Sequence, residues 1–265
     1  MIDKNKVNRN FSKGADTYDK AAIIQKYMAD KIEIFINGSK KNYKILEIGC
    51  GTGIFSKKIL NSFTNSRVDL LDISPGMLER AKEKLGERER IRYILNDIEQ
   101  HQPEEKYDII FSNATFQWIE NQENLFRHLY SILDFGGKIV FSTFGKKTYC
   151  ELRESFKSID GNLCFSQDFI TSKTLKEIVE ESFMVLVSDE EYMIESYPDV
   201  ITFLKMIRNI GANSAMGGDQ YLTKGRLVKL EDIYMSKYGD GTKIDVTNHL
   251  IYMVLEKRIE SRRGV

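Results

Sequence analysis

Three glycines at alternate positions, preceded by a glutamate, form the pattern with the clearest chemical meaning in this sequence. They make up Glu47-x-Gly49-x-Gly51-x-Gly53, which follows an apolar run and precedes an amphipathic segment. Because glycine has no Cβ, such a turn folds tightly and lets a ligand lie against the backbone. A buried strand that passes through this kind of turn into a helix is typical of a nucleotide-cofactor site. We expect Cys50 to contribute its backbone to the turn, with its sulfur as a small apolar filler.

Two acidic residues end the next two predicted strands. Asp72 lies 19 residues after Gly53, close to the spacing of about 20 at which a ribose-binding acid follows a glycine turn. We expect its carboxylate to accept both ribose hydroxyls. Asp97 follows the third predicted strand and is our candidate for binding an adenine amino group. The neighbouring residues expected to contact the cofactor are Ile73, Met77 and Ile98.

The glycine pattern resembles that of the class I S-adenosylmethionine (SAM)-dependent methyltransferases, which read E-x-G-x-G-x-G where dehydrogenases read G-x-G-x-x-G. The difference has a physical basis, because SAM has no pyrophosphate to place on a helix N-terminus. It carries instead an ammonium and a sulfonium, which favour acidic, carbonyl-rich walls. The resemblance implies SAM as the cofactor and a Rossmann-like fold. An ordinary tight turn in an α/β domain is the alternative interpretation.

Strand and helix signals alternate through most of the chain, which predicts a doubly wound α/β sheet. Ser74-Pro75 and Thr174-x-x-Glu177 predict helix starts, and Gly136-Gly137 predicts a turn into the fifth strand. The fold is therefore expected to be a seven-stranded, mostly parallel Rossmann-like sheet. Its strands are predicted at about 45–48, 68–72, 91–95, 107–112, 138–144, 184–194 and 250–257.

Two helical segments fall outside this alternation. The first, 1–40, is predicted to be an N-terminal helical cap whose apolar residues keep helical spacing up to a helix stop at Gly38. The second, 196–239, lies before the last strand, with helices beginning near Pro198 and Thr223. Ligands bind at the carboxyl ends of the strands in such sheets, so we expect this insertion to form a helical lid.

Composition supports a single domain over 1–265, with the Rossmann-like core at 41–195 and 240–265. The 265 residues, 42% of them hydrophobic, can bury one large core. Thirty-nine basic and 39 acidic side chains cancel, which argues against a nucleic-acid binder that relies on bulk charge. The three cysteines lack metal-ligand spacing, and no signal peptide or membrane-length apolar run is evident. We therefore expect no metal, no membrane attachment and a cytoplasmic location.

Six further stretches carry a more specific resemblance that spans nearly the whole chain. They are N-F-S-K-G-A-x-x-Y-D at 10–19, D-I-S-P-G-M-L at 72–78, S-N-A-x-x-Q-W at 112–118, S-T-F to E-L-R at 142–153, L-K to I-G-A-N at 204–213, and L-T to L-E-x-x-Y at 222–234. Together they resemble the malonyl-acyl-carrier-protein O-methyltransferases, which open the pimeloyl branch of biotin synthesis. The I-G-A-N and E-L-R stretches discriminate best. Lys13-Gly14 departs from the usual Arg-Ala of that family.

This resemblance implies an enzyme that methylates the free carboxylate of a malonyl thioester on acyl carrier protein, with malonyl-coenzyme A as a further acceptor to consider. A carboxylate, with a reference pKa of about 4, is already ionised at neutral pH and needs no general base. Opposite charges cancel as the carboxylate attacks the sulfonium methyl. A dry pocket with neutral donors therefore suits the reaction better than an arginine beside the methyl group.

Polar and aromatic residues near the predicted strand ends are the candidates for this chemistry. Tyr18, in the cap, is expected to contact the methyl region and orient the acceptor. Asn113 and Gln117 are expected at the rim of the fourth strand, in reach of SAM or the acceptor, and Trp118 is expected to wall the pocket. Arg153 is our candidate for holding a carboxylate or a phosphopantetheine phosphate. Packing at the rim and a surface ion pair with a neighbouring glutamate are the alternatives.

An acidic carrier protein needs a basic landing surface, and two local clusters are candidates. The first comprises Lys4, Lys6, Arg9 and Lys13, and the second Lys224, Arg226 and Lys229. Solvated helix faces are the alternative for both. Two other functions stay open at this point. One is a methyltransferase for a free small carboxylic acid or a lipid-like quinol, and the other is a SAM-binding regulatory protein without turnover.

Overall fold

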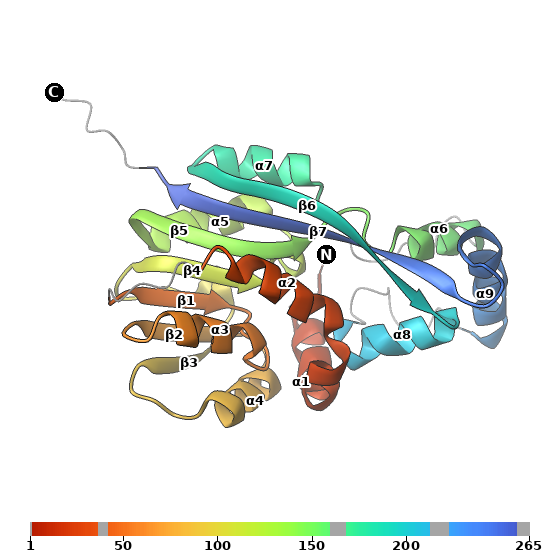
Figure 1. Ribbon diagram of the computed structural model, residues 1–265, viewed down its shortest axis with the longest axis horizontal. Helices are drawn as coiled ribbons and strands as arrows, with labels where there is room; N and C mark the ends of the chain where they lie inside the picture. Colours follow the sequence, from red (N-terminus) through yellow and green to blue (C-terminus); the bar gives the residue numbers. More distant parts are fainter. Residues whose placement is uncertain (1, 37–41, 160–167, 213–222, 259–265) are drawn as a thin grey trace.

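Seven strands form one sheet in the order β3-β2-β1-β4-β5-β7-β6 (Figure 1). The computed structural model describes residues 2–36, 42–159, 168–212 and 223–258. Strands β1 to β5 pair in parallel, whereas β7 runs antiparallel to both β5 and β6. The predicted seven-stranded, mostly parallel sheet is thereby confirmed. The strands are β1 (Lys44–Ile48), β2 (Arg67–Asp72), β3 (Ile91–Leu95), β4 (Tyr107–Asn113), β5 (Leu133–Phe144), β6 (Phe183–Tyr197) and β7 (Ile244–Lys257).

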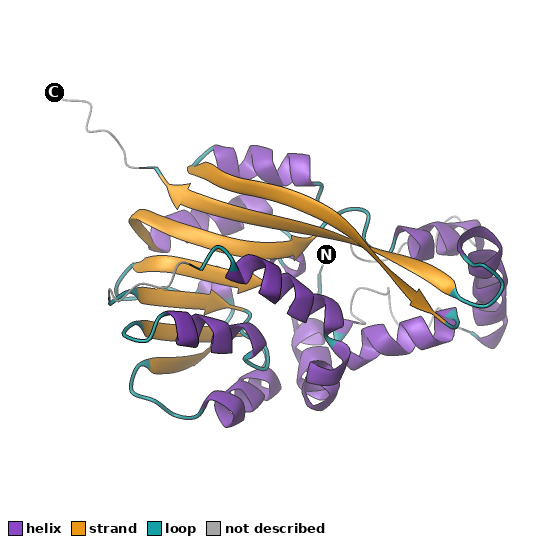
Figure 2. Cartoon of the chain, in the orientation of Figure 1, coloured by secondary structure: helices purple, strands orange, loops and turns teal. Residues whose placement is uncertain are grey.

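Helices cover both faces of the sheet because the buried strands are apolar on both sides (Figure 2). Ile45 and Leu46, neighbours on β1, belong to opposite cores. One core packs α2 (Ile23–Glu33), α3 (Ile54–Ser62) and α4 (Pro75–Leu85) against the sheet. The other core packs α5 (Gln122–Ile132) and α7 (Ser172–Glu180).

The N-terminal helix α1 (Lys4–Ala21) lies between α4 and α8 (Val200–Asn209), beside the ends of the central strands (Figure 1). Its contacts to both neighbours are close. A Cβ on Gly76 would lie 2.9 Å from the Ser12 carbonyl oxygen, and a Cβ on Gly211 would lie 2.8 Å from Phe11 Cα. Two short 3-10 helices, η1 (Ile98–Gln100) and η2 (Phe116–Trp118), follow β3 and β4.

A third core forms where β6 and β7 extend past the other strands (Figures 1 and 2). There α8 and α9 (Lys224–Tyr238) pack with α6 (Cys150–Ile159) through buried residues such as Leu152, Phe203 and Leu230. Helices α8 and α9 fall within the insertion expected from the sequence. Helix α6 comes from the range assigned to the Rossmann-like core, yet its apolar face packs with the insertion.

Two of the expected helix starts have the caps that their sequences suggest, and a third begins close to its expected position. The Ser74 hydroxyl accepts from the Met77 N–H at the start of α4, and the Thr223 hydroxyl accepts from the Arg226 N–H at the start of α9. Helix α8 begins just after Pro198, where Asp199 caps it. Each of these side chains satisfies a backbone donor that has no partner within the helix.

Two local predictions are wrong. Thr174 does not start α7, because Thr171 caps it one turn earlier and accepts from the Thr174 N–H at 3.0 Å. Gly136-Gly137 is not a turn before the fifth strand, because β5 begins at Leu133 directly after α5 and contains both glycines. They lie where the β4–β5 register shifts, and a Cβ on Gly137 would come within 2.9 Å of the Asp108 carbonyl oxygen. The glycines therefore accommodate a bulge.

Four residues to which the sequence predictions refer lie outside the described residues: the expected helix stop Gly38, one of the three cysteines (Cys164), and Asn213 and Leu222 at the ends of two of the resembling stretches. Among the helices of the described segments, none has the length and apolar character needed to cross a membrane. The described residues also contain no group of three or more His, Cys, Asp or Glu side chains that could hold a metal ion.

Candidate active site

The glycine turn joins β1 to α3 at the carboxyl edge of the sheet. Its three glycines have φ angles of +69° at Gly49, +54° at Gly51 and +83° at Gly53, a region that other residues rarely adopt. The Gly49 N–H donates to the Leu71 carbonyl at 2.8 Å, which fixes the turn to β2. A Cβ on Gly49 would lie 2.1 Å from Thr115 Oγ1, whereas one on Gly51 would meet open space. The turn thus combines close packing with an accessible backbone.

Asp72, at the end of β2, is buried beneath this turn. Its Oδ2 accepts from the Gly51 N–H and its Oδ1 from the Ser74 N–H, both at 2.8 Å. Burial raises the pKa of the carboxyl to about 6, although backbone hydrogen bonds from Ser74, Gly51 and Ile73 oppose the rise. An ionised carboxylate has about four lone-pair positions, so it keeps capacity to accept a further hydrogen bond from a ligand hydroxyl.

Glu47 supplies a second buried carboxyl group, with an oxygen that lacks a partner. The residue is 1% exposed, and no hydrogen bond to Oε2 is found among the described residues. Burial raises the pKa of Glu47 to about 8, and the charge of Asp72 adds to the rise. Glu47 lines a small pocket together with Tyr18 and Cys50. An orphaned buried carboxyl group in this position fits the ammonium of a methionyl group.

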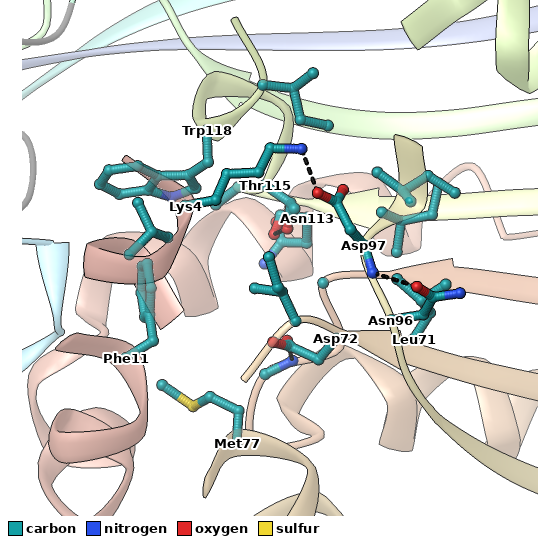
Figure 3. Close-up of a pocket in the computed structure, with 18 of the residues that line it drawn as sticks. Lys4, Phe11, Leu71, Asp72, Met77, Asn96, Asp97, Asn113, Thr115 and Trp118 are labelled. Atoms are coloured by element: carbon teal, nitrogen blue, oxygen red, sulfur yellow. Dashed lines mark hydrogen bonds and ion pairs between the residues drawn. The ribbon is translucent and has the colours of Figure 1, made fainter. Parts of the chain in front are cut away.

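Asp97 lies after β3 and is paired with Lys4 of α1 (Figure 3). The Lys4 ammonium also contacts Glu99, and its side chain lines the same pocket as Asp97. Lys4, expected from the sequence to belong to a carrier-docking cluster, lies instead at the adenine end of the expected cofactor site. The helical start of α1, capped by Asp3, brings it there.

The glycine turn, Asp72 and Asp97 line one pocket, which we call the cofactor pocket. Its walls bring together most of the predicted cofactor residues. Those that line it are Gly49, Gly51, Asp72, Ile73, Met77, Asp97, Ile98 and Asn113, together with Trp118. Glu47 and Cys50 line the adjoining small pocket, and Gly53 forms the N-terminal cap of α3.

A second, smaller pocket adjoins the cofactor pocket, and we call it the acceptor pocket. The two pockets share Phe11, Tyr18, Ala114 and Trp118. None of the described residues that line the acceptor pocket carries a charged side chain. Its other lining residues are Gln25, Gln117, Phe144, Thr148, Tyr149, Phe169, Ile210 and Ala212.

Tyr18 lies at the junction of all three pockets. Its ring is 6.5 Å from that of Phe11, which meets Trp118 edge-on at 5.4 Å. Burial raises the pKa of Tyr18, and the charges of Asp72 and Asp19 act in the same direction, so its hydroxyl stays neutral. The next residue, Asp19, pairs with Lys84 at 2.6 Å and holds this end of α1 on α4.

Asn113 and Gln117 also lie at the expected rim, but hydrogen bonds within the protein already use their amides. Asn113 Nδ2 donates to the Gln25 carbonyl at 2.9 Å, and its Oδ1 accepts from the Ser142 hydroxyl at 2.6 Å. Gln117 Nε2 donates to a backbone carbonyl at 2.6 Å, and its Oε1 accepts from the Thr143 hydroxyl at 3.1 Å. Their geometry suits bracing of the pocket walls more than direct contact with a substrate.

Two residues of the acceptor pocket have a strained backbone. Ala114 and Tyr149, with φ of +52° and +56°, are the two non-glycine residues with positive φ in the described segments. Both line the acceptor pocket. Such strain persists where the surrounding structure holds it, often at functional sites. No sequence pattern marked Tyr149, because positive φ at a tyrosine depends on tertiary contacts.

Arg153 and the basic cluster of α9 do not line either pocket. The Arg153 guanidinium donates to the backbone carbonyls of Lys146 and Thr148, so it stabilises the loop that carries Thr148 and Tyr149. The alternative expected for Arg153 was a surface ion pair with a neighbouring glutamate, and no such pair is found among the described residues. The cluster Lys224, Arg226 and Lys229 lies at the start of α9, and α9 lies beyond α8 as seen from α1 (Figure 1).

Comparison with solved structures identifies the fold class. Haemonchus contortus phosphoethanolamine N-methyltransferase 2, in complex with phosphomonomethylethanolamine and S-adenosylhomocysteine, superposes with a TM-score of 0.59. It is 19% identical, and the match covers 94% of this chain and 58% of the other. The 4+2 cyclase SpnF superposes with a TM-score of 0.57 at 13% identity, covering 88% and 82% of the two chains. Sheet, glycine turn and strand-end acids together define a class I methyltransferase fold.

Sequence comparison narrows the class to a family. A model described as a methyltransferase domain matches residues 46–139. Malonyl-acyl-carrier-protein O-methyltransferase 1 of Ilyobacter polytropus is 57% identical over 97% of this chain and 96% of its own length. The enzyme of that name from Halalkalibacterium halodurans is 32% identical over 97% and 99%. The chain belongs to the malonyl-acyl-carrier-protein O-methyltransferase family.

Proposed function

We propose that the protein transfers the methyl group of SAM to the free carboxylate of a malonyl group carried on acyl carrier protein. The observation that supports this most is the shared wall of the two pockets, where Tyr18 and Trp118 separate the cofactor from the acceptor. The names of the two relatives agree with this assignment. The ester product would then serve as the primer of pimeloyl synthesis, as the resemblance implies.

In this proposal three acids divide the recognition of SAM. Asp72 accepts the ribose hydroxyls beside the backbone donors that already hold its carboxylate. Asp97 binds the adenine amino group after exchanging its contact with Lys4. Glu47 meets the methionyl ammonium with its unpartnered oxygen. When bound, SAM supplies an electrophilic methyl group: a carboxylate oxygen forms the new C–O bond, the methyl–sulfur bond breaks, and its electron pair stays on sulfur.

The lining of the acceptor pocket favours a malonyl thioester over free malonate. Since no charged side chain lines the pocket among the described residues, a dianion would enter without a compensating cation. A malonyl thioester brings one carboxylate and a neutral, largely apolar remainder. The single charge stays reactive because neutral groups surround it, and the Tyr18 hydroxyl can orient it without forming an ion pair.

We also propose that the segment 196–239 acts as a lid over the acceptor. Ile210 and Ala212, just after α8, line the acceptor pocket, and the Thr17 hydroxyl donates to the Asn209 carbonyl at 2.9 Å. The end of α8 is therefore joined to the cap helix that carries Tyr18. Opening of the lid and of the cap would then be coupled.

The function is tested by supplying methyl-labelled SAM with malonyl carrier protein, malonyl-coenzyme A and free malonate in parallel. We expect rapid labelling of the malonyl carrier protein and little labelling of free malonate. Equal transfer to free malonate would support the alternative of a small-acid methyltransferase. A comparison of the two thioesters measures the contribution of the carrier protein itself.

A further inference from the structure

Gln25, on α2, is a largely buried residue that adjoins both halves of the site. The residue is 9% exposed, and it lines the acceptor pocket as well as the small pocket around Glu47. In the described part of the chain no hydrogen bond involves its side chain, whereas its backbone carbonyl accepts from Asn113 Nδ2. An amide that keeps its hydrogen-bonding groups free at the wall of two pockets is available to a bound ligand.

The position of Gln25 is fixed from two directions. Its carbonyl accepts from Asn113 Nδ2, and Asn113 is itself held by Ser142. Its neighbours Ile24 and Met28 are buried in the core between α2 and the sheet. The amide is thus carried on a rigid helix that is joined to the end of β4, as a group that orients a substrate should be.

Other polar side chains of the acceptor pocket are less available to bind a ligand, because they are already hydrogen-bonded within the protein. Gln117 has both ends of its amide bonded, and the Thr148 hydroxyl donates to the His249 carbonyl and accepts from the His249 N–H, each at 3.0 Å. An ionised carboxylate accepts hydrogen bonds only and needs N–H or O–H donors. Gln25 offers two N–H donors on one nitrogen, and Tyr18 lines the same pocket.

We propose that Gln25 binds and orients the acceptor carboxylate through its amide Nε2. This inference rests on the proposed function and specifies how the substrate is recognised. One carboxylate oxygen accepts the hydrogen bond from Gln25, while the other forms the C–O bond as the methyl–sulfur bond breaks and its electron pair remains on sulfur. A neutral amide orients the nucleophile but leaves its negative charge largely available, which a cationic side chain would not.

The test compares Gln25→Met, which keeps the size of the side chain but removes its donors, with Gln102→Met at an exposed position. The measurements are kcat/KM for malonyl carrier protein and affinities for malonyl carrier protein, for acetyl carrier protein, which lacks the carboxylate, and for S-adenosylhomocysteine. We expect Gln25→Met to lower kcat/KM for malonyl carrier protein by about 10- to 100-fold, the effect of losing a hydrogen bond to a charged group. Affinity for the acetyl form and for S-adenosylhomocysteine should stay within about threefold. The matched control should change none of them.

Two results would overturn the proposal. An equal loss of affinity for malonyl and acetyl carrier protein would show that Gln25 only packs the pocket. A loss confined to S-adenosylhomocysteine would assign the amide to the methionyl carboxylate instead. Failure of the proposed function is recognised separately, because the wild-type protein would then neither methylate malonyl carrier protein nor prefer it to the acetyl form.

Discussion

Glu47 should make SAM binding depend on pH. In the free protein its pKa is raised to about 8 by burial, so the carboxyl is mostly protonated at pH 7. An ammonium beside it favours the ionised form and lowers the pKa in the complex. The complex therefore holds fewer protons than the free protein, and affinity should rise with pH up to about 8, by at most tenfold per pH unit. Asp72, with a pKa of about 6, adds the same trend at lower pH.

Calorimetry between about pH 6 and 7.5 measures this effect below the titration of the ligand's own amino group, near 8. Titrations at pH 7 in buffers of different ionisation enthalpy should reveal proton release by the wild type. Glu47→Gln is the matched control, since it keeps the shape of the side chain and cannot release the proton. If the wild type and this variant share one pH profile, Glu47 does not meet the ammonium.

Tyr18 should act on the rate of methyl transfer rather than on cofactor affinity. Its hydroxyl is neutral and lies where the pockets meet, so it orients the acceptor without neutralising it. We expect Tyr18→Phe to lower the single-turnover rate and to leave SAM affinity within a few-fold. Tyr18→Ala should be slower still, because it also opens the site to water. If both variants transfer the methyl group at the wild-type rate, Tyr18 only packs against its neighbours and does not orient the acceptor.

The positions of the strand-end acids could be predicted from the sequence. Which amide side chains are already hydrogen-bonded within the protein could not. Asp72 and Asp97 were predictable because strand ends in a parallel sheet converge on one edge. The same logic named Asn113, yet whether its amide is available depends on Gln25 and Ser142, which are distant in sequence. Gln25 itself carried no signal, since one polar residue beside a helix's apolar stripe is common.

At the scale of elements, caps were predictable only where the sequence offers a single choice. Ser74-Pro75 starts α4 as expected, but Thr171 and Thr174 lie one turn apart and the structure uses the first. Tertiary packing decides between such candidates, because the helix extends as far as its apolar face is covered. The packing of α6 with α8 and α9 could not be predicted from the sequence either. It depends on how far β6 and β7 extend past the other strands of the sheet.

The contact between α1 and α8 should be intolerant of added volume. Gly211 has φ of +73°, and its Cβ would lie 2.8 Å from Phe11 Cα. Gly14, where the family usually has alanine, faces the same contact, with its Cβ 3.1 Å from the Gly211 nitrogen. We expect Gly211→Ala to lower the free energy of unfolding by about 1–3 kcal/mol. It should also lower kcat/KM for malonyl carrier protein, because Ile210 and Ala212 line the acceptor pocket.

Gly225→Ala provides the matched control for this element-scale prediction. Gly225 lies in the first turn of α9, and a Cβ there meets no atom within 4 Å. Alanine should therefore leave stability unchanged or raise it by up to about 1 kcal/mol. Urea unfolding of the two variants gives the comparison. Equal stabilities would mean that α8 can move away from α1 at little cost.

At the scale of the whole molecule, the third core places α9 beyond α8 as seen from α1 (Figure 1). The basic residues at the start of α9 line neither pocket, so carrier docking there would lie apart from the reacting carboxylate. The carrier brings its acyl group on a flexible phosphopantetheine arm, so the two sites need not coincide. Charge complementarity acts at this distance mainly on encounter and orientation.

We therefore predict that Lys224→Glu combined with Lys229→Glu raises KM for malonyl carrier protein several-fold, with kcat and turnover of a small malonyl thioester unchanged. Both lysines are exposed, so the fold should tolerate reversal. Added salt should weaken the wild-type reaction with the carrier and have less effect on the variant, because screening removes the same attraction. Lys57→Glu with Lys173→Glu, an equal change of charge on exposed positions of α3 and α7, controls for net charge. If both pairs raise KM equally, only the overall charge of the protein matters, and the carrier docks elsewhere.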